Sequence, residues 1–221
     1  MISMLLSEAA KAVGSPLTEK DATFSGCSTD SRTIKKGNLF IALKGEYFDG
    51  HEYISVAEKN GASSLIIDHE VSNTKPFIKV KDTRVAMGLL AKCWREKITI
   101  PLIAITGSNG KTTVKEMVTS ILSTISKVHS TSDNLNNDIG VPKTLFGLNK
   151  DHRYGVIEMG ANHLGEIGWL SKITSHVGFL LEVLVATIKK CSHISTSLLS
   201  DVKNICLRCF LHLSSHLDIL S

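Results

Sequence analysis

Eight consecutive residues near the middle of the chain have the types and the order needed to hold phosphate groups. Glycines at such positions bring backbone N–H groups close to phosphate oxygens, and the N-terminus of a following helix adds a partial positive charge. Lys111 supplies a point charge for the β- and γ-phosphates, and the Thr112 hydroxyl is a typical Mg²⁺ ligand. The segment therefore predicts a loop that binds ATP with Mg²⁺. Its residues are Thr106, Gly107, Ser108, Asn109, Gly110, Lys111, Thr112 and Thr113.

This loop departs from the common form G-x-x-x-x-G-K-[ST], because Ile105 stands where that form has its first glycine. The chain carries the shorter form G-x-x-G-K-T. The ordinary alternative is a chance glycine turn beside a surface lysine. The context argues against it, since an apolar run over 101–105 predicts a strand before the loop and an apolar stripe predicts a helix after it.

Glu158 is the second candidate for chemistry, because it ends an apolar run over 154–157 that predicts a strand. In a parallel sheet, the carboxyl ends of the strands face the ligand crevice. We therefore expect Glu158 to act with Lys111 as a catalytic residue and with Thr112 as a Mg²⁺ ligand. A solvated carboxylate at a strand end is the alternative.

The elements that position these residues alternate between strand and helix along the chain, which predicts the α/β class with parallel sheets covered on both faces. We expect a small N-terminal α/β domain over 1–82, then an incomplete parallel-sheet ATP-binding domain of the P-loop type over 83–175. Helices are expected over 3–13, 51–60, 83–97, from 111 onward and over 141–148, and strands over 38–43, 64–67, 76–80, 101–105, 127–129 and 154–157.

Composition narrows the class of protein. The chain has 221 residues, 43% of them hydrophobic and 21% charged, which is typical of a globular protein. A net charge of +4 from scattered lysines suits small anionic ligands and does not indicate nucleic acid. The N-terminus does not resemble a secretory signal, no apolar run has membrane-spanning length, and the five cysteines form no framework. We expect a cytoplasmic protein without membrane insertion.

Several segments, which follow one another along the chain as they do in the family, resemble the Mur ligase family of peptidoglycan synthesis. The phosphate loop is similar to the family's Thr-Gly-x-x-Gly-Lys-Thr, and residues 134–142 resemble its asparagine-rich turn. Residues 158–167 are most similar to the member that adds D-alanyl-D-alanine. Residues 29–32, 37–45 and 48–51 resemble the part of the family that holds the UDP end of the substrate.

The resemblance implies a reaction and a set of ligands. ATP and Mg²⁺ would serve to phosphorylate the terminal carboxylate of UDP-N-acetylmuramoyl-tripeptide, and the amine of D-alanyl-D-alanine would attack the acyl phosphate. Asn136 and Asn137 would join the phosphate loop in binding the nucleotide. The residues implied to contact the substrate are Ser31, Arg32, Gly45, Asp49, His51, Asn134 and His163.

Each of these residues also has an ordinary interpretation. Any single asparagine of the turn is equally well explained by turn formation. Arg32 meets a diphosphate on one interpretation and is a solvated surface residue on the other. His51 and His163 are individually weak indicators of function.

The likeness to the family is expected to end near residue 175. The following segment, rich in Leu, Ser, Cys and His, lacks the family's later motifs, and we hypothesise that the reading frame shifts near residues 176–180. The tail contains Cys206, Cys209, His212 and His216, in the spacing C-x₂-C-x₂-H-x₃-H. These ligands lie too close together for an ordinary zinc module, which separates its ligand pairs by a dozen or more residues.

Three functions remain open at this point. The first is an ATP-dependent amide ligase of cell-wall synthesis, or an incomplete part of one. The second is a catalytically inactive protein that binds a nucleotide or a UDP-sugar. The third is a related ligase of the folylpolyglutamate type, which residues 160–163 and the UDP-type N-terminal segments disfavour.

Overall fold

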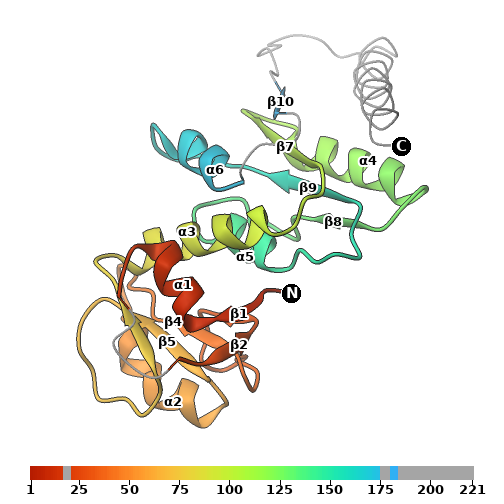
Figure 1. Cartoon of the computed structure of the whole chain (residues 1–221). Coiled ribbons are helices and arrows are strands. Elements are labelled where there is room, and N and C mark those ends of the chain that lie inside the picture. The colour runs from red at the N-terminus through yellow and green to blue at the C-terminus, as the bar shows by residue number, and fades with distance from the viewer. Residues whose placement is uncertain (17–20, 175–179, 184–221) are drawn as a thin grey trace, which may run out of the picture.

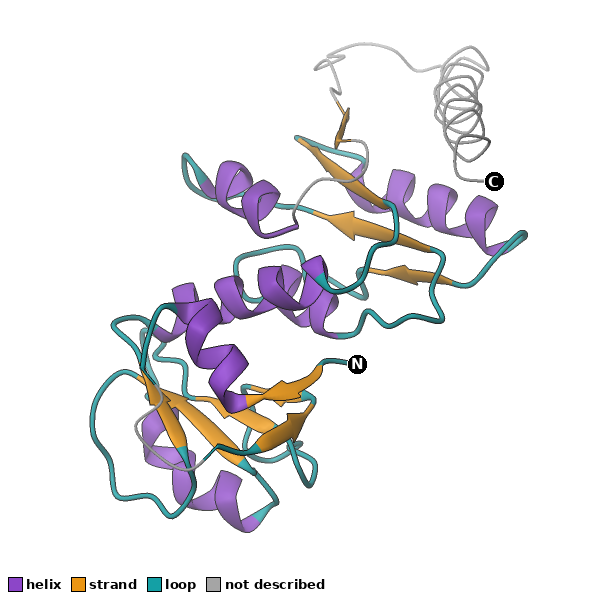
Figure 2. Ribbon diagram, in the orientation of Figure 1, coloured by secondary structure: helices purple, strands orange, loops and turns teal. Residues whose placement is uncertain are grey.

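The computed structural model describes residues 1–16, 21–174 and 180–183. Its first sheet has four parallel strands in the order β3-β4-β5-β6, and a short antiparallel pair, β1 with β2, lies beside it (Figures 1 and 2). The strands are β1 (Ser3–Leu5), β2 (Thr23–Ser25), β3 (Cys27–Ser28), β4 (Leu39–Ile41), β5 (Ser64–Ile67) and β6 (Phe77–Lys79).

The second sheet is also parallel throughout and has the order β10-β7-β9-β8. The strand that precedes the phosphate loop, β7, therefore lies inside this sheet between β10 and β9. The α/β class with parallel sheets is confirmed. The strands are β7 (Leu102–Gly107), β8 (Val128–Ser130), β9 (Tyr154–Glu158) and β10 (Leu180–Val183).

Helices cover both faces of each sheet. Between the two sheets lie α1, α3, α5 and α6, while α2 covers the outer face of the first sheet and α4 that of the second (Figure 1). Within the described ranges, no helix is both long enough and apolar enough to cross a membrane. The helices are α1 (Leu6–Val13), the 3₁₀ helix η1 (Gly50–Tyr53), α2 (Ile54–Lys59), α3 (Thr83–Glu96), α4 (Lys111–Ser123), α5 (Gly140–Phe146) and α6 (Glu166–Thr174).

The strands β4, β5, β7 and β9 are buried on both faces for most of their length, as inner parallel strands must be, and their residues alternate between two cores. In β5, Ile66 belongs to the core between the sheets, whereas Leu65 and Ile67 pack on the α2 side. In β7, Ala104 points into the same shared core, whereas Ile103 packs on the α4 side. One apolar core is thus enclosed by both sheets.

Helix α3 lies at the centre of this shared core. It begins at the N-cap Asp82, whose carboxylate accepts the backbone N–H groups of Arg84 and Val85 at 2.8 and 3.0 Å. Near its other end, the buried Trp94 donates its indole N–H to the carbonyl of Leu148 at 3.1 Å. The helix is therefore fixed at both ends, to its own cap and to the chain that follows α5.

The expected elements over 64–67, 76–80, 83–97 and 154–157 are confirmed within one or two residues. The helix expected over 3–13 is wrong at its start, because residues 3–5 form β1 and pair with β2. The helix expected over 51–60 begins instead as the 3₁₀ turn η1. Strands β2 and β3 and helix α6 were not expected from the sequence.

Strand β10 corrects the expected end of the native fold near residue 175. Its four residues pair in parallel with β7, from Leu180 opposite Ala104 to Val183 opposite Gly107. The hypothesis of a shifted reading frame near residues 176–180 concerns the coding DNA, which this pairing does not test, and it stays a prediction. The remaining tail, with its Cys206, Cys209, His212 and His216, lies outside the described residues.

Arg95 supports a prediction about stability. Only 2% of it is exposed, and its guanidinium donates to the carbonyls of Ile98, Ile100 and Thr174, which tie α3 to the segment before β7 and to the end of α6. Replacing it with methionine leaves these buried carbonyls unpartnered. We expect Arg95→Met to lower the free energy of unfolding by about 2–4 kcal/mol, measured by chemical denaturation.

The matched control is Arg84→Met on the same helix. Arg84 is exposed and forms a 3.1 Å ion pair with Asp138, a kind of contact worth at most about 1 kcal/mol. Equal losses for the two variants would contradict the structural role given to Arg95.

Candidate functional site

The phosphate loop lies at the carboxyl end of β7 and depends on two glycines with positive φ angles. Gly107 has φ of 143° and Gly110 has φ of 76°, both in the region that favours glycine. Gly110 is also the N-cap of α4, which has no side-chain cap, so the first backbone N–H groups of that helix are free to meet an anion. The exposed residues of the loop are Ser108, Asn109, Gly110, Thr112 and Thr113.

Lys111 folds back over this loop. Its Nζ donates to the carbonyl oxygen of Gly107 at 2.8 Å. The ammonium group is therefore held across the mouth of the loop, where the phosphates of a nucleotide would meet it.

Glu158 ends β9, and in the pairing of the two strands it stands opposite Ile105 of β7, next to the phosphate loop. Only 2% of the residue is exposed. Its Oε1 accepts the side-chain amide of Asn136 at 2.9 Å, whereas its buried Oε2 has no hydrogen-bond partner among the described residues. A buried carboxylate oxygen without a partner is costly. A cation satisfies it, and Mg²⁺ takes oxygen ligands of this kind, so the residues present fit this metal.

The buried Lys115, which was not singled out from the sequence, supports Glu158 through Thr131. The Nζ of Lys115, on α4, donates to the carbonyl of Thr131 at 2.8 Å and pairs with Glu116 at the same distance. The hydroxyl of Thr131 in turn accepts the backbone N–H of Glu158 at 3.0 Å. A lysine beside an apolar stripe normally faces solvent, so its sequence position gave no signal of this role.

The asparagines of the asparagine-rich turn make different hydrogen bonds. Asn136 holds Glu158 through its side chain, and its carbonyl accepts the N–H of Gly160 at 2.7 Å. The side-chain oxygen of Asn137 accepts the N–H groups of Ile139 and Gly140, at 3.2 and 2.8 Å, and so holds the turn that leads into α5. Asn134 contributes its backbone carbonyl to the turn.

A pocket of about 420 Å³ forms a second candidate site, between the first sheet and α5. Sequence analysis expected Ser31 and Arg32 there but missed Lys143, which reaches the pocket from α5. The Arg32 guanidinium bonds Asp30 at 2.7 Å and, as the largest cause, lowers the pKa of that carboxyl to about 2. The lining residues are Thr29, Asp30, Ser31, Arg32, Phe40, Phe48, Gly50, Tyr53 and Lys143.

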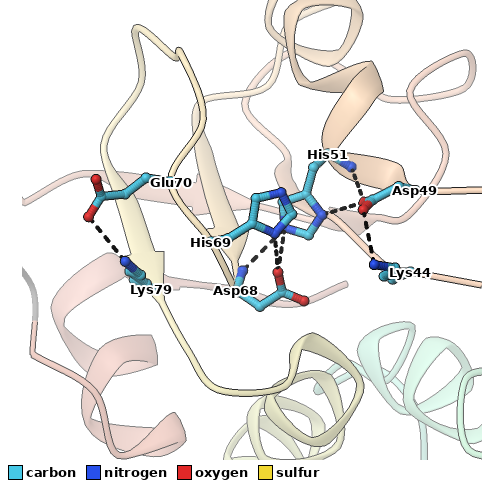
Figure 3. A network of polar contacts seen from close by, with 7 residues as sticks. All are labelled: Lys44, Asp49, His51, Asp68, His69, Glu70 and Lys79. Carbon is cyan, nitrogen blue, oxygen red and sulfur yellow. Dashed lines mark hydrogen bonds and ion pairs between the residues drawn. The ribbon is translucent and has the colours of Figure 1, made fainter.

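Three other expected substrate residues lie outside the lining of this pocket. Asp49 and His51 contact each other, with 2.6 Å between the carboxylate and Nδ1 (Figure 3). Gly45 packs against the ring of Phe48, which does line the pocket, and a Cβ at position 45 would overlap that ring.

His163 does not line the pocket and lies in the exposed segment after β9. Its Nδ1 is 2.9 Å from Glu166 at the start of α6. This hydrogen bond is the largest of the causes that lower the pKa of Glu166. The pair fixes the turn that leads from Glu158 into α6.

Two family models match the chain. Residues 23–95 match the Mur ligase family, catalytic domain, and residues 105–186 match the Mur ligase middle domain. The second match extends past residue 175, so the likeness to the family continues beyond the limit expected from the sequence and includes β10.

Curated relatives include the UDP-N-acetylmuramoyl-tripeptide--D-alanyl-D-alanine ligase of Escherichia coli, 43% identical over 84% of this chain and 41% of the relative. The Haemophilus influenzae ligase of the same name is 50% identical over 66% of this chain and 33% of the relative. This chain thus matches about two fifths or less of the length of these relatives.

Solved structures give the same picture. A ligase of this kind from Acinetobacter baumannii superposes with a TM-score of 0.76 and 38% identity, covering 84% of this chain and 43% of that one. MurF ligase from Thermotoga maritima, in complex with ADP, superposes with a TM-score of 0.63 and 31% identity, covering 67% of this chain and 35% of that one.

The turn that holds Asn136 depends on Gly140, since a Cβ there would lie 2.3 Å from the backbone carbon of Leu135. We expect Gly140→Ala to lower the free energy of unfolding by about 1–3 kcal/mol. Gly168→Ala is the matched control, because a Cβ within α6 at that position meets nothing within 4 Å. That control should raise stability by about 0.5–1 kcal/mol in the same denaturation experiment. A neutral Gly140→Ala would contradict the tight turn.

Proposed function

This chain belongs to the Mur ligase family, and we propose that it carries the ATP site and the UDP-substrate site of a ligase joining D-alanyl-D-alanine to UDP-N-acetylmuramoyl-tripeptide. The observation that carries the proposal is the buried Glu158 carboxylate at the strand end beside the phosphate loop, with one oxygen left for a cation. The names of the curated relatives support the choice of substrates.

In this reaction, the terminal carboxylate of the tripeptide attacks the γ-phosphorus of ATP to give an acyl phosphate and ADP, and the amine of D-alanyl-D-alanine then displaces phosphate. Such a transfer depends on positioning and on neutralising charge. Lys111 would leave the Gly107 carbonyl to bind the β- and γ-phosphates. Thr112 and Glu158 would hold Mg²⁺, which neutralises phosphate charge. Asn136 keeps the Glu158 carboxylate turned toward that position.

The other proposed contacts with ATP come from the phosphate loop, and those with UDP come from the lining of the pocket. Residues 107–113, with Asn136 and Asn137 nearby, would bind ATP. Ser31 and Arg32 would bind the diphosphate of the UDP group, with Lys143 as a second cation. The aromatic rings of Phe48 and Tyr53 offer a face for the uracil.

The other residues proposed to contact the substrate lie outside the lining of the pocket. Gly45, Asp49 and His51 would support the UDP pocket from its rim. Asn134 and His163 lie in the segments around Glu158, where the peptide end of the substrate would arrive.

The proposal also covers domains and location. We assign the UDP substrate to residues 1–82 and the nucleotide to the part from residue 83 onward. A cytoplasmic location suits the described cysteines, because Cys27 and Cys93 are both unpaired thiols.

Ligand capture without ligation is the second candidate. It is favoured by the UDP pocket, whose lining comes from residues 29–53 and Lys143 and needs nothing from the phosphate loop. The two candidates differ in ADP release. Release of ADP from ATP that depends on the UDP-tripeptide supports the ligase reaction, whereas binding of both ligands without such release supports capture alone.

The ATP site gives a sharp prediction. Lys111→Met removes the ammonium group that would bind the phosphates but keeps the length of the side chain. We expect the affinity for ADP with Mg²⁺ to fall about 10–100-fold, as for the loss of a charge-assisted hydrogen bond, measured by calorimetric titration. Lys150→Met, at an exposed lysine outside the loop, is the control and should bind as the wild type does. Equal affinities of the wild type and both variants would show that Lys111 does not bind the nucleotide.

The UDP pocket gives an independent prediction through Lys143. Because this exposed cation is proposed to meet a diphosphate, Lys143→Met should weaken UDP binding about 2–5-fold and reduce its dependence on salt. Uridine lacks the phosphates, so its weak binding should not change. An equal loss of affinity for UDP and for uridine would show that Lys143 shapes the pocket and does not bind the diphosphate.

A further inference from the structure

We propose that His51, Asp68 and His69 form a zinc site, with Asp49 as the carboxylate that orients His51. These residues lie where two loops of the first sheet meet, the one leading into η1 and the one after β5 (Figure 3). The site goes beyond the proposed ligase reaction, which needs none of these side chains as a metal ligand.

Asp49 fixes the ring of His51 in one orientation. The His51 side chain is 2% exposed, and Asp49 Oδ1 accepts its backbone N–H at 2.9 Å. The same oxygen lies 2.6 Å from the ring Nδ1. Because a carboxylate only accepts, Nδ1 carries the proton and donates it to Asp49. The other ring nitrogen, Nε2, is left with its lone pair directed at Asp68. This carboxylate–histidine arrangement is the one that prepares an imidazole to bind zinc.

His51 Nε2 and Asp68 Oδ1 then face each other as two electron-pair donors 3.4 Å apart. Nε2 also accepts the backbone N–H of Asp68 at 3.2 Å, a hydrogen bond that a metal would replace. The same Oδ1 lies 2.5 Å from Nδ1 of His69. No lysine or arginine of the described segments forms an ion pair with Asp68, whereas Asp49 has Lys44 at 3.9 Å. The position between these atoms is therefore suited to a cation.

The donor set and its spacing fit zinc. With bonds of about 2.0–2.1 Å, neighbouring ligand atoms of a tetrahedral zinc site lie about 3.3–3.4 Å apart, close to the 3.4 Å between His51 Nε2 and Asp68 Oδ1. One ligand atom each from Asp49, His51 and His69 also lie within 4.8 Å of one another. The ring of His69 stacks on that of His51 at 4.0 Å and its side chain is 52% exposed, so it can turn to complete the site.

Zinc at this position would clamp η1 to the end of β5. Gly50 and Tyr53, both in η1, line the UDP pocket. The metal would thus steady one wall of that pocket from outside it, as a structural ion does, and would leave the lining itself unchanged.

The test uses the full-length chain, dialysed against zinc and then against metal-free buffer, with bound metal measured by mass spectrometry. We expect His69→Ala to lose one equivalent of zinc relative to the wild type. Asp49→Asn should keep the ligands but weaken zinc binding about 10–100-fold in a competition titration with a chelator, as loss of an orienting carboxylate does. His163→Ala, which removes an exposed histidine elsewhere, is the control and should keep the wild-type zinc content.

X-ray absorption at the zinc edge separates this cluster from the cysteines near the C-terminus. Nitrogen and oxygen ligands, lost in His69→Ala, would support the proposal. Sulfur ligands only, or equal zinc contents in the wild type and His69→Ala, would overturn it.

Discussion

The burial of one layer of helices between two sheets is the constraint on which the rest of the structure depends. Helix α3 contributes Met87 and Leu90 to this core, and each fully buried side chain of that size is worth about 1.5–3 kcal/mol. The contact with α6 is so close that a Cβ at Gly88 would lie 2.6 Å from the ring of Trp169. The inner faces of both sheets therefore pack against the same layer of helices. This layer supports both candidate sites.

Polar contacts run from one candidate site to the other along the edge of this core. Lys115 reaches Thr131, Thr131 accepts from Glu158, and Glu158 accepts from Asn136. The next residue, Asn137, holds the turn before α5, and that helix carries Lys143 to the pocket beside the first sheet. One short turn therefore connects the carboxylate of Glu158 beside the phosphate loop with the helix that carries Lys143 to the pocket. This continuity gives a physical reason for the two candidate sites to be held in a fixed relation to each other.

Sequence reasoning found what periodicity and local chemistry determine. Helix α3 and strand β9 follow from apolar spacing, and the context of the phosphate loop follows from its glycines. It could not find contacts made between distant segments. The inward turn of Lys115 toward Thr131 and the reach of Lys143 into the pocket depend on tertiary packing.

Short elements were missed for a related reason. The segment over 3–5 has a helical pattern of apolar residues, but pairing with β2 decides its conformation. The composition of the segment after residue 175 disguised β10, because Leu-rich sequence is compatible with either a strand or a helix.

The order of strands in the second sheet has a consequence for the way the chain folds. Strand β7 carries the phosphate loop, yet both of its neighbours, β9 and β10, come later in the sequence. A chain emerging from the ribosome makes the loop before it makes either strand that holds β7 in place. Parallel pairings between distant segments form slowly because loop closure precedes their stabilisation. The nucleotide loop is thus among the last parts of the molecule to become rigid, and during synthesis its strand has two edges open to other chains.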